Sequence, residues 1–358
     1  MRAACIHLRP FTRFHFGEVR MDNNLALAST SLWAHSDTLF SALVSAYSLY
    51  NGSADAFVSA FRSGELQISS FFYFLKKGSR RIYFLPKPHF LSIDADFQES
   101  GTHKLQNGIA FVSVGVWEKG FQQQRWFEPT DADFKVVNER FVMTREELEA
   151  LALADEGKAS WSIVRRTTQP KSPQRANTAD ASIFYQTDVE ISAAPATRDD
   201  VPIQSGGYFL YRANSPEAEA QLRTATQLVA YSGLGGERHH IGRTPLHQEG
   251  QEAVEFVDWS LQSDASSTHF SNLSLFNPQG PEDLQHLLYY RTVLRGGRPL
   301  SATHALKVVR MIREGALLTS DQVKGRLVPT GPDELGHETL RHGLPFLLPL
   351  SHQLNLTP

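Results

Sequence analysis

The stretch SDTLFSALVSAYSLY, residues 36–50, decides how the first half of the chain is interpreted. Its apolar residues recur at spacings of three and four, which places them on one face of a helix that begins at Ser36 or Asp37. The residues on this face are Leu39, Phe40, Leu43, Ala46, Tyr47 and Tyr50. The pattern therefore predicts an amphipathic helix with one buried face.

Strand-like and helix-like segments extend outward from this helix. Strands are predicted over residues 2–9, 66–75, 81–85, 183–191, 208–212, 253–261, 269–276 and, as an edge strand, 340–350, with a weaker strand pattern at 109–117. Helices are predicted over 55–62, from the capping box Thr144–Glu147 onward, over 216–231, and briefly from Pro281. Strands divided by helices and joined by hairpins indicate an α+β fold with antiparallel sheets and helices on one face, such as ferredoxin-like units.

The domain organisation follows from length and from two irregular stretches. A chain of 358 residues is long enough for two domains, which we expect at residues 1–155 and 156–358. Residues 89–137 mix polar loop with the weak strand pattern and are expected to form a functional insertion. Residues 157–180 contain Pro, Ser, Thr and basic residues and are expected to form a basic loop at the start of the second domain.

Composition limits the class of protein. Hydrophobic residues make up 41% of the chain, so it can bury a large core and is not disordered. The single cysteine, Cys5, lies in an apolar run, which excludes a disulfide framework and is more typical of a buried strand residue than of a nucleophile. No apolar run reaches 18 residues and no apolar leader is present, so we expect a soluble cytoplasmic protein without a membrane partner.

The charges are separated along the sequence although their sum is only −3. Residues 75–93, 157–179 and 284–313 contain no acid but several Lys and Arg residues. Such segregation favours one face that binds an anionic partner and another that contacts protein. Ordinary solvated surfaces remain an alternative explanation.

The sharpest motif is GLGGERHHIGR, residues 233–243. Glycine allows the backbone to approach a ligand closely, and consecutive backbone N–H groups can surround a phosphate. Arg238 and Arg243 would neutralise that phosphate, and His239 and His240 would stack on bases or ribose. A dinucleotide fingerprint would have to follow a strand, whereas this segment follows a helix. A flexible surface loop is the alternative.

The basic loop carries Arg165, Arg166, Lys171, Arg175 and Asn177. Long basic loops without acids commonly become ordered against a phosphate backbone. A mobile linker between domains explains the same composition.

No constellation requires an enzyme. His15 with His239 or His240 would suit acid–base cleavage of RNA, but neighbouring side chains in a strand point to opposite faces. A metal site of His239, His240 and His247 lacks carboxylate or cysteine support. We therefore expect no catalytic residue, no metal and no cofactor.

Several short motifs together resemble one family. They are Phe14-His-Phe-Gly17, Ser36-Asp-Thr-Leu-Phe-Ser-Ala-Leu43, Ile82-Tyr-Phe-Leu-Pro-Lys-Pro88, Arg175-Ala-Asn-Thr-Ala-Asp180, Gly206-Gly-Tyr-Phe-Leu210, the glycine-rich segment, Leu273-Ser-Leu-Phe-Asn-Pro278, Arg295-Gly-Gly297, Met311-Ile-Arg-Glu-Gly315 and His342-Gly-Leu-Pro-Phe346. Because these motifs occur in this order, the chain resembles the family of Csm complex subunit four. These are Cas-five-group RAMP proteins that bind the crRNA 5′ handle in type III-A CRISPR complexes. In the glycine-rich segment, however, His239-His240-Ile241 replaces small residues, so a related type III subtype stays open.

The resemblance implies two ferredoxin-like RAMP domains and a β-hairpin thumb, for which residues 89–137 are the candidate. It also implies a non-catalytic subunit that binds the crRNA 5′ tag, meets target RNA through the guide duplex, distorts that duplex with its thumb, and contacts a large palm-domain subunit and a backbone RAMP subunit in antiviral defence. The RNA-binding residues predicted by motif and resemblance are His15, Phe16, Gly17, Ser36, Arg165, Arg166, Lys171, Arg175, Asn177, Gly233, Gly235, Gly236, Arg238, His239, His240, Gly242 and Arg243. A metal-independent endoribonuclease and a protein-only scaffold are the alternatives.

Overall fold

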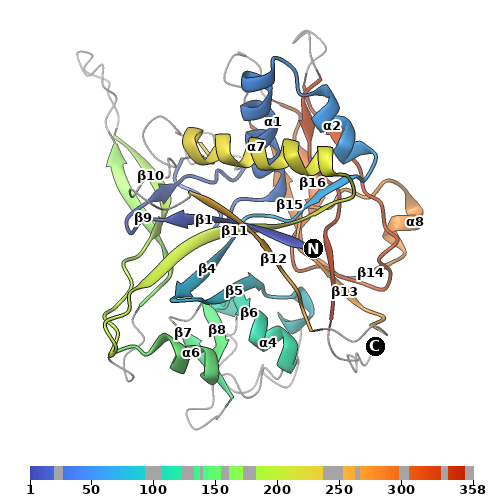
Figure 1. Ribbon diagram of the computed structural model, residues 1–358. Coiled ribbons are helices and arrows are strands. Elements are labelled where there is room, and N and C mark those ends of the chain that lie inside the picture. Colours follow the sequence, from blue (N-terminus) through green and yellow to red (C-terminus); the bar gives the residue numbers. More distant parts are fainter. Residues whose placement is uncertain are drawn as a thin grey trace, which may run out of the picture.

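The structure is a computed structural model in which α and β elements are mixed and most strands pair antiparallel (Figure 1). It describes residues 1–19, 27–92, 107–121, 133–137, 140–154, 161–171, 183–236, 253–262, 267–297, 306–331 and 338–350. The α+β class predicted from the sequence is confirmed. No helix in these ranges is long and apolar enough to cross a membrane.

A nine-stranded sheet forms the centre of the molecule. Its strands are β1 (Arg2–Leu8), β3 (Leu66–Ile68), β4 (Phe72–Lys77), β5 (Arg80–Pro86), β6 (Phe111–Ser113), β7 (Phe134–Val137), β8 (Phe141–Thr144), β11 (Ile203–Ala213) and β12 (Val254–Asp258). They run in the order β12-β1-β11-β4-β5-β6-β8-β7, and β3 also pairs with β11. The β6–β8 pair is parallel and the other pairs in this sheet are antiparallel.

The central sheet takes strands from both sides of residue 155. β1, near the N-terminus, pairs along its length with β11, so that Arg2 lies opposite Tyr211 and Leu8 opposite Ser205. The other edge of β1 pairs with β12. The two parts expected at 1–155 and 156–358 are therefore joined through one sheet, and their independence as folding units stays a prediction.

Three helices pack on one side of this sheet (Figure 1). They are α1 (Ser36–Asn51), α2 (Asp55–Arg62) and α7 (Pro216–Ser232). The apolar face predicted for α1 is buried from Leu39 to Ala46, but Tyr50 is largely exposed because the helix extends past the core. α7 begins where Ser215 accepts a hydrogen bond from the N–H of Ala218, which is an N-cap followed by proline at the first helical position.

One predicted strand is interrupted. Residues 66–75 were expected as a single strand, but β3 ends at Ile68 and β4 begins at Phe72. The two serines between them divert the backbone: the Ser69 hydroxyl donates to the carbonyl of Ser70, and the Ser70 hydroxyl accepts from the N–H of Ser36 at 2.8 Å. Serine side chains of this kind compete with a strand ladder for backbone groups.

The described part of the expected insertion belongs to the core. Residues 109–117 were predicted as a strand, but only β6 is extended, and α4 (Val114–Lys119) follows it directly. Ser113 caps α4 by accepting from the N–H of Val116, a start signal that the sequence analysis did not use. α6 (Arg145–Leu151) begins at the predicted capping box of Thr144 and Glu147, which is confirmed. Val116 and Trp117 are fully buried, so this part of residues 89–137 forms no projecting hairpin.

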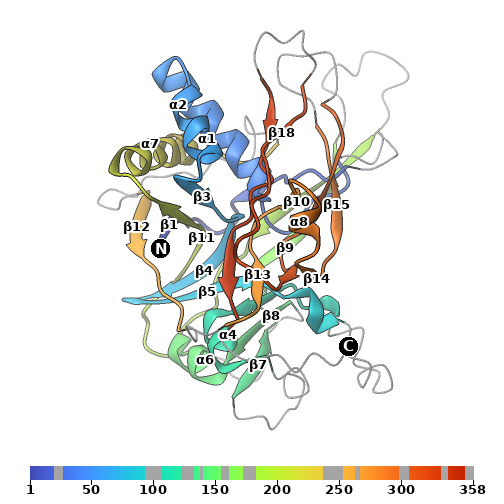
Figure 2. The same cartoon turned by 90° about the vertical axis from the view of Figure 1, so that its right-hand side faces the viewer.

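The C-terminal part adds short strands beside the central sheet. They are β13 (Phe270–Asn272), β14 (Leu287–Tyr289), β15 (Thr292–Arg295), β16 (Val309–Ile312), β17 (Leu317–Leu318), β18 (Val328–Pro329), β19 (Leu340–Arg341) and β20 (Leu347–Pro349), and the short helix α8 (Pro281–Leu284) lies among them in the sequence. The short 3-10 helix η2 (His89–Ser92) follows β5. Figure 2 shows these strands in orange and red next to β4 and β5. Leu273, Phe346 and Leu348 enter the main hydrophobic core. β20 is the edge of the sheet β14-β17-β13-β20, which confirms an edge strand at residues 347–349. The single strand predicted over 340–350 is otherwise wrong, because residues 340–341 form β19, which pairs with β18 in another sheet, and residues 342–346 are not in a strand.

The stretch predicted as a basic loop contains a strand. β9 (Val164–Lys171) pairs antiparallel with β10 (Phe184–Ile191), and β10 also pairs with the two-residue β2 (Arg13–Phe14). The loop expected over 157–180 is therefore wrong for residues 164–171. Figure 1 shows this β9–β10 ribbon at the left edge of the molecule.

Candidate nucleic-acid interface

A polar cavity of about 290 Å³ brings together six segments of the chain. They are the segment after β2, the first turns of α1, the glycine-rich segment after α7, the end of β15, the residue Leu306 before β16, and Arg341 of β19. The lining residues are His15, Gly17, Asp37, Thr38, Ser41, Ala42, Gly235, Gly236, Arg295, Gly296, Gly297, Leu306 and Arg341. Four of the motifs quoted from the sequence thus meet at one place.

Asp37, Arg295 and Arg341 form the most strongly charged part of the cavity wall. Arg295 donates to both oxygens of the Asp37 carboxylate, with Nε 2.9 Å from Oδ2 and Nη2 3.0 Å from Oδ1. Arg341 also donates to the Asp37 carboxylate. Two guanidinium groups against one carboxylate leave a net positive charge, and all three side chains are almost completely buried.

This network sets the ionisation of Asp37. Burial alone would raise its pKa, but the Arg295 and Arg341 guanidinium groups outweigh burial and hold the pKa of Asp37 well below its usual range. Arg295 also donates to the Thr38 hydroxyl at 2.9 Å and to the carbonyl of Gly17 at 3.1 Å. The guanidinium therefore ties the start of α1 to the segment after β2 and fixes the shape of the cavity.

His15 connects the glycine-rich segment to the β9–β10 ribbon. Its carbonyl accepts the N–H of Gly236 at 2.8 Å, and its Nδ1 lies 2.9 Å from the carbonyl of Thr187 in β10. Gly235 has φ +94°, and a Cβ there would lie 2.6 Å from the His15 carbonyl oxygen. Glycine is therefore required at 235 for both backbone conformation and space. His15 holds the glycine-rich segment next to β10.

Phe16 and Ser36 support the cavity from behind. Phe16 is buried and stacks on Phe14 with ring centroids 5.4 Å apart. Ser36 is fully buried, and its hydroxyl accepts the N–H of Leu275 at 2.9 Å and lies 3.1 Å from Nδ1 of His342. Neither side chain lines the cavity. Phe16 lies between His15 and Gly17 in an extended segment and points to the opposite face, and Ser36, in the first turn of α1, is rotated by about 100° from Asp37 around the helix axis.

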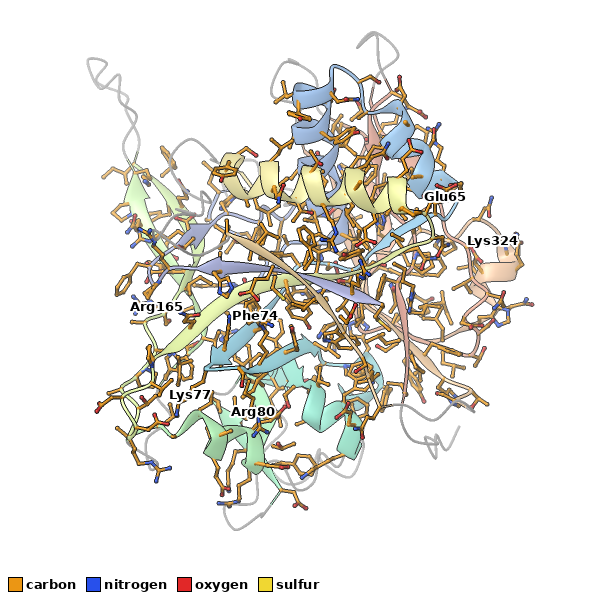
Figure 3. All side chains as sticks on the ribbon, in the orientation of Figure 1. Glu65, Phe74, Lys77, Arg80, Arg165 and Lys324 are labelled. Carbon is orange, nitrogen blue, oxygen red and sulfur yellow. The ribbon has the colours of Figure 1, made fainter. Side chains whose placement is uncertain are left out.

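The basic residues of β9 lie apart from the cavity. Arg165 donates to the buried Glu190 of β10 with Nε at 2.9 Å, and Figure 3 shows it on the outer flank of the molecule. Arg165 and Arg166 are successive residues of a strand, so their side chains point to opposite faces. Lys171 shares the face of Arg165 at the far end of β9. The three cations predicted together are therefore not gathered at one point.

Several predicted residues lie outside the described ranges: Arg175, Asn177, Arg238, His239, His240, Gly242 and Arg243. Gly233, in contrast, is placed: it ends α7 with φ 86°, and its N–H donates to the carbonyl of Val229 at 2.8 Å. The described ranges contain no group of three or more His, Cys, Asp or Glu side chains arranged to hold a metal ion.

Asp37, Thr38, Arg295 and Arg341 were not predicted as site residues. The first three lie in quoted motifs and Arg341 directly precedes one, but no spacing in one sequence indicates that Asp37 meets two arginines more than 250 positions away. The available signals were an aspartate in the first turn of a predicted helix and, separately, Arg295 within the basic stretch 284–313, and nothing in one sequence connects the two.

The buried His342 makes the stability of the protein depend on pH. His342 is fully buried, and burial lowers its pKa to about 4 although Asp37 favours the charged form. The unfolded chain, with a histidine pKa of about 6.5, binds a proton between pH 6.5 and 4 that the folded protein does not. We expect the free energy of unfolding to fall as pH falls through this window, by about 1.4 kcal/mol per pH unit for this group. Urea unfolding at pH 4–7 should show a slope that is shallower by about one proton in His342→Gln, and an unchanged slope would contradict the assignment.

Comparison with known proteins supports the resemblance that was predicted from the sequence. Residues 265–350 match the family model described as the CRISPR Csm4 C-terminal domain. This part of the chain is therefore similar to the C-terminal domain of Csm4 proteins. Over 383 aligned residues the chain is 24% identical to the CRISPR system protein Csm4 of Methanocaldococcus jannaschii, covering 95% of each protein. The resemblance to the Csm4 proteins that was predicted from the sequence is confirmed.

Solved structures show the same fold as this Csm4-like chain. A chain of the Csm3–Csm4 subcomplex of the type III-A CRISPR-Cas interference complex has a TM-score of 0.64 at 18% identity, with 98% of this chain and 99% of that chain covered. A chain of a Csm1–Csm4 cassette in complex with cA4 has a TM-score of 0.55 at 18% identity, with 100% of both chains covered.

Proposed function

We propose that this protein is the non-catalytic subunit of a type III-A CRISPR complex that binds the 5′ tag of the crRNA. The cavity is the main support for this proposal. Four of the motifs by which the chain resembles handle-binding proteins meet there, and its wall carries a net positive charge. Glycine backbone, the hydroxyl groups of Thr38 and Ser41, and Arg295 suit a phosphate and the ribose next to it. The function in the cell is antiviral defence in the cytoplasm.

The proposed partners come from the similar structures. Csm4 is named there in complexes with Csm3 and with Csm1. We propose that this chain likewise contacts a backbone RAMP subunit and a large palm-domain subunit, and meets target RNA through the guide duplex. Because the pI is about 6.5, RNA binding by the isolated subunit is expected to be weak, so binding tests use the assembled complex.

The thumb is proposed at a different place from the one expected from the sequence. The described part of residues 89–137 is packed into the core, whereas the β9–β10 ribbon stands at the edge of the molecule with an exposed Tyr185. A two-stranded ribbon with exposed apolar and basic residues suits insertion beside a nucleic-acid duplex. We also propose that the protein consists of two ferredoxin-like domains and that this ribbon belongs to one of them.

A substitution on α1 tests the cavity directly. Ser41 is exposed and lines the cavity, so Ser41→Glu places a carboxylate where we expect a phosphate. We expect affinity of the reconstituted complex for tag RNA to fall about tenfold, which corresponds to about 1.4 kcal/mol. Affinity is measured by filter binding at one fixed salt concentration, because phosphate contacts depend on salt.

Ser45→Glu is the matched control. Ser45 is the same residue type, exposed on the same helix one turn further on, and it does not line the cavity. It adds the same charge at nearly the same distance from the body of the protein. Equal losses for both variants, or none for Ser41→Glu, would show that the tag does not occupy the cavity.

Crosslinking identifies the RNA itself. The complex is purified from cells that express the neighbouring genes, irradiated, and the bound RNA is sequenced. Guide RNAs with one common 5′ end, crosslinked near residues 233–243, are expected. Cleavage of a guide precursor in EDTA would instead favour an endoribonuclease, and absence of any crosslink would favour a protein-only scaffold.

A further inference from the structure

Phe11 combines two properties that rarely occur together. Its side chain is 62% exposed, and its backbone has φ +68°. Positive φ is unfavourable for a bulky L-residue, and glycine or asparagine normally occupies such a position. The other two phenylalanines of this segment, Phe14 and Phe16, are buried in the core. The chain therefore holds an aromatic ring in solvent at a position where a smaller residue would fit the backbone better.

The backbone around Phe11 is held by main-chain hydrogen bonds. The N–H of Phe11 donates to the carbonyl of Ile191 at 2.7 Å, and the N–H of Ile191 donates to the carbonyl of Thr12 at 2.9 Å. The N–H of Thr12 closes a turn on the carbonyl of Arg9 at 3.2 Å. None of these bonds uses the phenylalanine side chain, so the fold fixes the position of the ring without depending on it.

Two arginine side chains lie near the same turn, on β2 and β9. Arg13, two residues further on, donates to Glu190 at 2.6 Å, and Arg165 donates to the same carboxylate from the other neighbouring strand. Arg9, two residues before Phe11, is exposed, and Arg166 is exposed on β9. The two arginines that contact Glu190 exceed its single negative charge, so this end of β2 and β10 is positively charged, which suits a phosphate backbone.

The turn and the cavity lie on one continuous segment. Phe11 is four residues before His15, so their Cα atoms are at most about 14 Å apart. The segment passes from the exposed ring through β2 into the wall of the cavity. A single strand of RNA that enters the cavity can therefore reach the ring.

We propose that Phe11 is a stacking platform for one unpaired base of the bound RNA. Bases stack on exposed aromatic rings without regard to sequence, and neighbouring arginines bind the phosphates of the same strand. The inference rests on the proposed RNA-binding function and adds a contact outside the cavity.

The decisive variant is Phe11→Gly, which separates stacking from stability. Glycine adopts the positive φ without strain, so thermal unfolding of the variant should stay at or above the temperature of the parent protein. Affinity of the reconstituted complex for tag RNA should fall about 5- to 150-fold, which is the loss of one stacked base at 1–3 kcal/mol. Phe11→Tyr keeps an aromatic ring and should keep most of the affinity.

Tyr50→Ala is the control for an exposed aromatic elsewhere, since Tyr50 is 68% exposed at the far end of α1. It should leave affinity unchanged. Full RNA affinity of Phe11→Gly, while Ser41→Glu remains impaired, would overturn the stacking site and leave the proposed function intact. Failure of Phe11→Gly to assemble with the other subunits would assign Phe11 to a protein interface and also overturn the stacking site. Failure of the parent complex to bind tag RNA would remove the proposed function itself.

Discussion

Replacing Asp37 with alanine is expected to lower the free energy of unfolding by about 3–5 kcal/mol, because the substitution leaves buried charge without a partner. Arg295 donates to both carboxylate oxygens of Asp37 and Arg341 donates to one of them. Without that carboxylate, two guanidinium groups remain away from water beside each other. Urea unfolding at neutral pH, followed by tryptophan fluorescence, measures the loss.

The control is Asp55→Ala, which removes an aspartate from the first turn of α2. Asp55 is exposed, and its carboxylate accepts a hydrogen bond only from its neighbour Ser53 among the described contacts. Its loss should cost less than about 1 kcal/mol, as for a charge at an exposed helix start. A similar small cost for Asp37→Ala would show that the network does not hold the two parts of the chain together.

Replacing Trp117 with alanine is expected to cost about 3–5 kcal/mol, which is typical of a large side chain removed from a packed core. Trp117 is fully buried, and its ring centroid lies 5.3 Å from that of Phe121. Its Nε1 donates to the carbonyl of Pro349 at 3.2 Å, so the same side chain links α4 to β20. Thermal or urea unfolding of the variant measures the effect.

Tyr185→Ala provides the comparison on the β9–β10 ribbon. Tyr185 is 57% exposed, and its replacement should change stability by less than about 1 kcal/mol. The pair of variants distinguishes a core element from a projecting one. If Trp117→Ala were neutral and Tyr185→Ala costly, the insertion at 89–137 would be the projecting thumb after all.

The sequence alone determined the elements whose signals are local. α2 occupies the predicted residues 55–62, and the capping box of Thr144 and Glu147 begins α6 as expected. Pro216 and Pro281 stand at the first positions of their helices. Caps, proline and a three-and-four apolar spacing act within one or two turns, so a single sequence contains them. The resemblance to the Csm4 proteins was likewise available from short motifs in order.

The tertiary structure alone decided what depends on contacts between distant residues. β9 looked like a loop because its side chains are polar, and it is a strand because β10 supplies its backbone partners. β1 joins β11 across about 200 positions and β12 across about 250, which no local pattern indicates. The buried network of Asp37, Arg295 and Arg341 depends on distant contacts for the same reason. Folding removes these charges from water, so each needs an oppositely charged partner, and only the tertiary structure brings these partners together.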